Sequence, residues 1–181
     1  SLVANTTGIH NTAVGKGSMA AITTGQGNTA IGALSLDAGT TANDNPSLGY
    51  KALTTNTTGH YNVAVGKDAL EMATTASNNT AVGYKSLEEN TTGASNTTVG
   101  YKAGASVTTG GTNVIIGYSA AAYTNNSTTG GDNVIIGAFA RTSSATVSTE
   151  IAIGRYVLGQ GALTATVGMN GQGATISLDG S

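Results

Sequence analysis

A five-residue segment returns along this chain at a fixed interval of seventeen residues. It reads NTAVG at 11–15, and related segments close on a glycine in ten places. The closing glycines are Gly15, Gly32, Gly49, Gly66, Gly83, Gly100, Gly117, Gly137, Gly154 and Gly168. The first six gaps are 17 residues long, and the last three are 20, 17 and 14. A fixed short period indicates a stack of equivalent structural units.

Each unit has the sequence of a β-coil. The recurring segment is rich in Val, Ile and Thr, which favour strands. A second short segment ending in Leu follows the glycine in most units, and a polar loop containing Thr-Thr-Gly leads to the next unit. Helical repeats need roughly 30 residues or more, so 17 are too few. We therefore predict an all-β, parallel β-solenoid of about ten coils with about 4.8 Å per coil.

The composition suits a thin coil and excludes several functions. Charged residues make up 9% of the chain and aromatic residues 4%, whereas there are 27 glycines. The net charge of −2 provides no electrostatic footprint for nucleic acid. No apolar run approaches the roughly 20 residues of a membrane helix. We expect neither a nucleic-acid partner nor insertion into a membrane.

The irregular gaps predict where the stack changes. The gap of 20 contains three extra residues near Tyr123–Ser127, which we expect to form a surface loop that leaves the strand register intact. The gap of 14 is a coil shortened by three residues. We expect a repeat domain over 1–168, with 169–181 as a C-terminal end or a linker to a downstream domain.

The strand residues between the asparagine and the glycine are named here the first, second and third positions. Successive side chains point to opposite faces of a strand. The third position is apolar in every unit, so we assign it, with the first, to the inside of the coil. The second position would then point outward, and because it is small or apolar it requires a second chain to cover it. The predicted interface residues are Ala13, Ala30, Ala64, Ala81, Ile115 and Ile135.

The repeats resemble those of a known family. The NTAVG strand, its glycine and the following x-x-A-L resemble the head repeats of trimeric autotransporter adhesins (YadA-like), and 152–168 has that family's 14-residue spacing. The segment NTTGHYNVAVGKDAL at 56–70 also resembles repeats in bacteriophage tail fibres. The resemblance implies a left-handed β-roll, a side-by-side homotrimer, and attachment to a cell-surface polysaccharide or receptor. It implies a location in the virion or at the bacterial cell surface.

An asparagine opens the recurring segment in eight of the ten units. Amide side chains that are stacked at strand spacing can bond one another along the stack. We therefore expect a structural amide ladder rather than a ligand site. Its members are Asn11, Asn28, Asn45, Asn62, Asn79, Asn96, Asn113 and Asn133.

Cations and tyrosines gather just after the closing glycine. Six of the seven cations lie one or two places past it, and tyrosines fill the same places in other units. One interpretation is an edge that binds acidic glycans, formed by Lys51, Lys85, Lys102, Tyr84, Tyr101 and Tyr118. The other is a tyrosine column with cations paired to nearby acids, which stabilises the sheet without a ligand. We favour the second.

The titratable residues do not converge on one site. His10 and His60 lie three units apart, which is about 14 Å along the stack. We predict no enzyme, no catalytic residue, no metal and no cofactor.

The leading hypothesis is a structural and attachment segment of a phage tail fibre or a trimeric adhesin. The alternative is an ice-binding solenoid, which needs a flat, exposed ladder of threonine pairs; first-position threonines assigned to the interior count against it.

Overall fold

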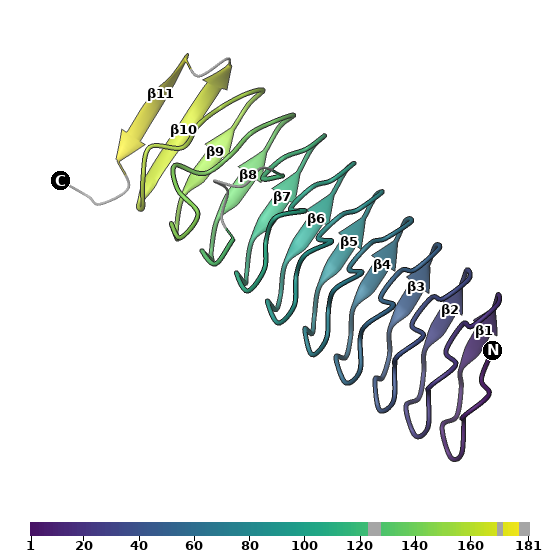
Figure 1. Ribbon diagram of the computed structural model, residues 1–181. Coiled ribbons are helices and arrows are strands. Elements are labelled where there is room, and N and C mark those ends of the chain that lie inside the picture. Colours follow the sequence, from purple (N-terminus) through teal and green to yellow (C-terminus); the bar gives the residue numbers. More distant parts are fainter. Residues whose placement is uncertain (123–127, 170–171, 178–181) are drawn as a thin grey trace.

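In the computed structural model the chain forms one straight stack of β-coils (Figure 1). The structure describes residues 1–122, 128–169 and 172–177. Strands β1 to β10 pair in parallel in chain order, whereas β11 pairs antiparallel with β10. No helix occurs within these described ranges. The predicted all-β solenoid with 17-residue spacing is therefore confirmed.

Each coil contributes one short strand to a single eleven-stranded sheet. The strands are β1 Thr12–Val14, β2 Thr29–Ile31, β3 Pro46–Leu48, β4 Val63–Val65, β5 Thr80–Val82, β6 Thr97–Val99, β7 Val114–Ile116, β8 Val134–Ile136, β9 Ile151–Ile153, β10 Thr164–Met169 and β11 Gln172–Ser177.

The register repeats from coil to coil. Ala64 of β4 pairs with Ala81 of β5, so equivalent positions of the repeat stand directly above one another. Val114 of β7 pairs with Val134 of β8 across the 20-residue gap, so the insertion leaves the register unchanged. The inserted segment 123–127 itself lies outside the described residues. The domain boundary expected at 168 falls within β10, and β11 continues the same sheet.

The coil turns where the backbone enters the left-handed region. In the coil that follows β5, φ is +133° at Gly83, 54° at Lys85 and 56° at Leu87. A Cβ atom at Gly83 would lie 2.3 Å from the carbonyl oxygen of Gly100 in the next coil, which is closer than non-bonded atoms approach. The corner therefore requires glycine both for its φ and for the close contact between coils.

The interior is filled by two facing columns of side chains. One column is the second strand position, where Ala64 and Ala81 are fully buried. The other lies four residues past the closing glycine, where Leu70 and Leu87 are fully buried as well. The assignment of faces from the sequence is therefore wrong: the second position points inward, and the first and third positions point outward. Val14, for example, is 56% exposed and Leu48 46% exposed.

The two interior columns compensate each other in size. Most coils combine a small second-position residue with Met or Leu in the facing column. Where the facing column falls to Gly104, a Cβ there would meet Ile115 Cδ1 at 3.2 Å and Leu87 Cδ1 at 3.3 Å. Ile115 thus occupies the space that a leucine fills elsewhere. This exchange keeps the narrow interior close-packed, as stable cores require.

Candidate functional surfaces

The residues predicted to form the interface between chains lie inside the coil. Five of them, Ala30, Ala64, Ala81, Ile115 and Ile135, are fully buried within a single chain, and Ala13 in the first coil is half-buried. They pack against the coil's own second segment and cannot contact another chain without unfolding. The prediction that the second position forms the interface is corrected accordingly. The error arose because the side chains on both faces of the strand are apolar, so hydropathy did not show which face lies inside the coil.

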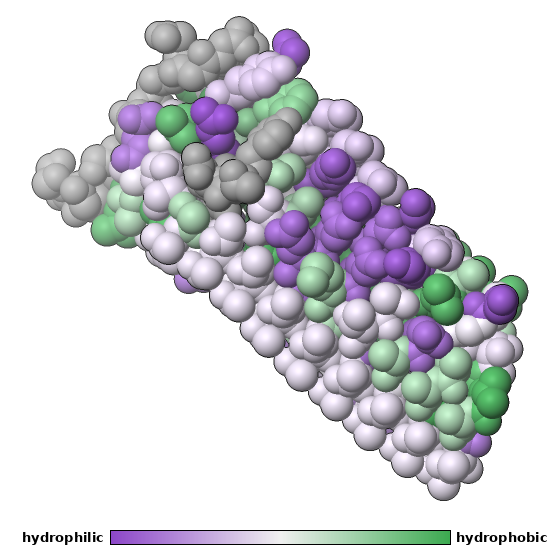
Figure 2. All heavy atoms as spheres, in the orientation of Figure 1, coloured by the Kyte–Doolittle hydropathy of each residue, from purple (hydrophilic) through white to green (hydrophobic). Residues whose placement is uncertain are grey.

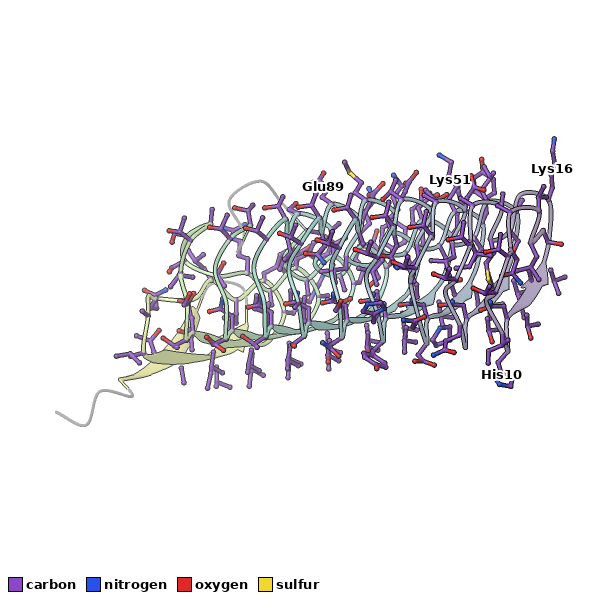
Figure 3. The ribbon with its side chains drawn as sticks, turned by 90° about the horizontal axis from the view of Figure 1, so that it is seen from below. His10, Lys16, Lys51 and Glu89 are labelled. Atoms are coloured by element: carbon purple, nitrogen blue, oxygen red, sulfur yellow. The ribbon has the colours of Figure 1, made fainter. Side chains whose placement is uncertain are left out.

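The outward side of the sheet presents the first and third positions, and we name it the outer sheet face. In Figure 3 the strand side chains project below the sheet, away from the coil interior. Neither position carries a charged side chain in β1–β10. The third position is Val, Ile or Leu in every coil, and in the single chain several of these side chains are exposed. An exposed apolar surface of this extent is typical of an interaction site.

The asparagines predicted to form a ladder do hydrogen-bond along the stack. Asn79 Nδ2 donates to Asn62 Oδ1 at 3.2 Å and to the Gly93 carbonyl at 2.9 Å. Asn79 Oδ1 in turn accepts from the backbone N–H of Asn96 at 2.9 Å and from its Nδ2 at 3.1 Å. The same pattern links all eight asparagines from Asn11 to Asn133. Every member beyond the first is fully buried, so solvent and ligands cannot reach the ladder.

Glu150 takes the asparagine position in the following coil, and the sequence analysis missed its role. Its backbone N–H donates to Asn133 Oδ1 at 2.9 Å, which continues the ladder. Its buried carboxylate accepts from the backbone N–H of Ser143 at 2.9 Å and of Gly161 at 2.6 Å. Each asparagine side chain of the ladder donates to a backbone carbonyl, whereas the carboxylate of Glu150 accepts from backbone N–H groups instead. The alignment of EIAIG with the other segments is the signal that placed Glu150 in this column.

The residues one and two places past the glycine form an aromatic column, which we name the corner column. Tyr84 and Tyr101 stack at 5.2 Å between ring centroids, and Tyr101 and Tyr118 at 4.9 Å with only 8° between their planes. Phe139 meets Tyr118 edge-on at 5.3 Å and stacks on Tyr156 at 4.7 Å. Stacked rings cover each other's faces. The stacked pairs therefore leave no gap between their rings for a sugar, whereas Tyr118 and Phe139 meet only edge to face.

A lysine continues the corner column in the coil between those of Tyr50 and Tyr84. Lys67 Nζ lies 5.8 Å from the ring centroid of Tyr50 and 5.7 Å from that of Tyr84. Both distances are within the range of a cation–π interaction. Lys67 thus bridges the two tyrosines that flank it and continues the column through a coil without an aromatic ring at this place.

Acidic side chains balance much of the charge at this edge. Lys51 Nζ lies 3.0 Å from Glu71 Oε1, and Lys85 Nζ lies 2.6 Å from Glu88 Oε1. These hydrogen bonds to carboxylates raise the pKa of both lysines above the usual value. Between residues 51 and 102 the chain carries four lysines and four acids, and hydrophilic residues gather over the middle of the rod (Figure 2). A balanced edge of this kind has little net attraction for a polyanion.

We therefore predict that the corner column is structural. Changing Lys51, Lys85 and Lys102 together to Gln should lower the melting temperature slightly, because exposed ion pairs stabilise proteins only weakly. Neither the wild type nor the triple variant should be retained on heparin-agarose at any salt concentration. Lys16→Gln, which changes an exposed cation of the first coil, is the control for loss of charge alone. Salt-sensitive retention of the wild type that the triple variant loses would instead support a glycan-binding edge.

Threonines line the loop edge of the rod. The first threonine of each Thr-Thr pair donates its hydroxyl to the next coil, as Thr57 Oγ1 does to the Thr74 carbonyl at 3.0 Å. The second threonine is exposed in successive coils, for example at Thr58, Thr75 and Thr92. Only one of the two hydroxyls in each pair therefore faces solvent freely, and the exposed row is a single residue wide.

Among the described residues, no three His, Cys, Asp or Glu side chains come together in a way that could hold a metal ion. The same part of the chain contains no helix that is long and apolar enough to cross a membrane. His60 forms a hydrogen bond between coils, since its Nδ1 accepts from the backbone N–H of Asn43 at 3.0 Å.

No family model matches the chain, and comparison with curated proteins and with solved structures finds none that is similar.

Proposed function

We propose that this chain is a structural and attachment segment of a fibrous surface protein, either a phage tail fibre or a trimeric bacterial adhesin. In this proposal three copies pack side by side through their outer sheet faces. The observation that carries it is the uncharged, apolar outer sheet face on a straight rod. A surface of this kind is costly to leave in water along its whole length.

The dimensions of the outer sheet face suit a long interface. Ten parallel strands are separated by nine steps of about 4.8 Å, which makes the face about 43 Å long, and three-residue strands make it about 10 Å wide. Monomeric proteins rarely expose contiguous apolar patches larger than a few hundred Å². The outer sheet face covers about 430 Å², which is the size of the largest apolar patch on a typical monomer, and patches of that size are often functional.

Another copy of the same chain is the partner that fits this surface best. The outer sheet face is straight and repeats at the coil spacing, so a partner needs an apolar surface of equal length and equal repeat. A second copy supplies this surface by construction, and rotational symmetry lets each copy bury its face against the others. The number three comes from the resemblance to trimeric adhesin heads and tail fibres.

A stack of coils also suits the mechanical part of the role. Each coil contacts only its neighbours along the stack, which is the architecture of a quasi-one-dimensional repeat protein. Three such stacks side by side would form a stiff spacer that holds a receptor-binding part away from the surface. This role needs no catalytic group and no cofactor.

Sedimentation tests the proposal with a matched pair of variants. We expect the wild type to sediment as a trimer at micromolar concentration. Ile136→Lys places a charge on the outer sheet face and should yield folded monomers, because a buried unpaired charge is strongly unfavourable. Thr129→Lys places the same charge on the exposed loop edge just before β8 and should leave the trimer intact. A wild type that remains a folded monomer would reject the proposal, and a dimer would reject the number three.

The ice-binding alternative is not favoured by the surfaces of the rod. First-position threonines do face outward, contrary to expectation, but they occur only at Thr12, Thr29, Thr80 and Thr97. The remaining coils place Pro, Val, Ile or Ala there, beside an aliphatic third position. The loop edge has an uninterrupted row of threonines, but that row is one residue wide. Neither surface offers a flat ladder of threonine pairs.

A further inference from the structure

We infer that copies of this chain associate most strongly through the coils of β7, β8 and β9, and only weakly through those of β1, β2 and β3. This inference rests on the proposed function, because it divides the outer sheet face into a strong and a weak part. Coils with the same backbone conformation would thus contribute unequally to the association of the copies. The evidence is the composition of the outward side chains.

The outward positions of β7–β9 are entirely β-branched and aliphatic. They are Val114, Ile116, Val134, Ile136, Ile151 and Ile153. These residues stand in register, since Val114 pairs with Val134 and Ile116 with Ile136, and the pattern continues into β9. With Ala165 and Val167 of β10, they belong to the longest run of coils on this face without a hydroxyl group or a proline, and within that run β7–β9 carry the larger side chains.

The outward positions of β1–β3 are mixed. They are Thr12, Val14, Thr29, Ile31, Pro46 and Leu48. Each of these coils therefore presents one aliphatic residue beside a threonine or a proline. The aliphatic row is one residue wide here and two residues wide in β7–β9.

This difference affects association more than folding of the single chain. A threonine hydroxyl on the outer sheet face bonds to water in the free chain, and in a dry interface it must find a partner or lose that hydrogen bond. An aliphatic side chain at the same place gains from leaving water. Contact between copies is thus favourable at both positions in β7–β9 and at one position in β1–β3.

The chain contains a closely matched pair of residues for testing this inference. Ile31 in β2 and Ile116 in β7 occupy the same third position, are the same residue type, and are 39% and 38% exposed. They differ in the neighbouring first position, which is Thr29 in one coil and Val114 in the other. Because both side chains point outward, a substitution at either leaves the interior of the coil untouched.

The experiment compares Ile31→Lys with Ile116→Lys in the full chain. The concentration at which half of the chains are assembled is measured by sedimentation velocity, and circular dichroism of dilute samples verifies that each variant retains its β-coil. We expect Ile116→Lys to raise this concentration by about 100-fold or more and Ile31→Lys by less than about 10-fold. Because the dissociation constant of a trimer varies with the square of this concentration, each factor of ten is about 2.8 kcal/mol per trimer.

Each outcome separates this inference from the proposed function. Equal shifts for the two variants, or a larger shift for Ile31→Lys, overturn the inference and leave the assembly itself in place. A wild type that never assembles rejects the proposed function. Ile31→Thr and Ile116→Thr provide an uncharged version of the comparison, in which the second substitution should again have the larger effect.

Discussion

Replacing the corner glycine Gly83 by alanine is expected to destabilise the fold by about 2–5 kcal/mol. About 1–2 kcal/mol comes from placing a side chain on a residue with φ of +133°. About 1–3 kcal/mol comes from overpacking, because the new Cβ would lie 2.3 Å from the Gly100 carbonyl oxygen and the next coil must move away. A loss of this size is a large fraction of the 5–15 kcal/mol that typically stabilises a domain. Chemical denaturation followed by circular dichroism measures it.

Gly161 provides the control for this prediction. Its φ of +123° is also in the left-handed region, but nothing lies within 4 Å of where its Cβ would be. Gly161→Ala should therefore cost only the conformational part, about 1–2 kcal/mol. If the two substitutions destabilise the protein equally, close stacking of the corners is not what requires glycine at Gly83.

Replacing Asn79 by alanine in the middle of the ladder is expected to cost about 2–4 kcal/mol. The substitution removes the acceptor for the backbone N–H and Nδ2 of Asn96, whereas the Gly93 carbonyl keeps the hydrogen bond that it accepts from Asn90 Nδ2. The buried Asn96 N–H left without a partner costs about 1–3 kcal/mol, and the other lost hydrogen bonds of the Asn79 side chain cost about 1 kcal/mol more. Thermal denaturation should show the loss as a lower melting temperature.

Two further variants define the cause. Asn78→Gly changes the exposed neighbour of Asn79, whose φ of 61° glycine adopts readily, and should be nearly neutral. Asn79→Asp keeps the acceptor oxygens but loses the donor, and would place a carboxylate oxygen beside the Asn62 side-chain oxygen and the Gly93 carbonyl. It should be at least as destabilising as alanine at neutral pH. If Asn79→Ala costs less than about 1 kcal/mol, the ladder follows from coil stacking and does not stabilise it.

The spacing of residues predicted the coil, its parallel pairing and its register. Gaps between glycines depend only on the length of chain in one coil, and equal lengths place equal positions above one another. The asparagine column could be predicted on the same basis, because a polar residue that recurs at the coil period needs a partner at the coil spacing. Pairing of Lys51 with Glu71 was predicted less directly, since it depends on the paths of two flexible side chains.

The face of the strand could not be predicted from hydropathy. Alternation shows that the first and third positions share a face, but not which face is inside. Both columns are apolar here, so the usual contrast between a polar and an apolar face is missing. Assigning the larger residues to the interior was reasonable for a thick core. The interior of this coil is narrow, and it takes alanine from the strand and leucine from the facing segment.

A signal for the correct face was nevertheless present in the sequence. Where the residue four places past the glycine shrinks from Leu87 to Gly104 and Ala121, the second position of the following coil grows from Thr98 to Ile115 and Ile135. Two columns that exchange volume in this way pack against each other. Such compensation within the repeats of one chain identifies the interior without any comparison between proteins.

The unchanged register between β7 and β8 has a consequence for how this molecule can vary. Three extra residues in the intervening loop leave Val114 opposite Val134, so loop length and strand position are independent. Mutation can then lengthen, shorten or rewrite loops without shifting any residue on the outer sheet face. Duplicating or deleting a whole coil likewise changes reach and preserves the spacing. The architecture thus separates the part of the sequence that is free to diversify from the part that must stay constant.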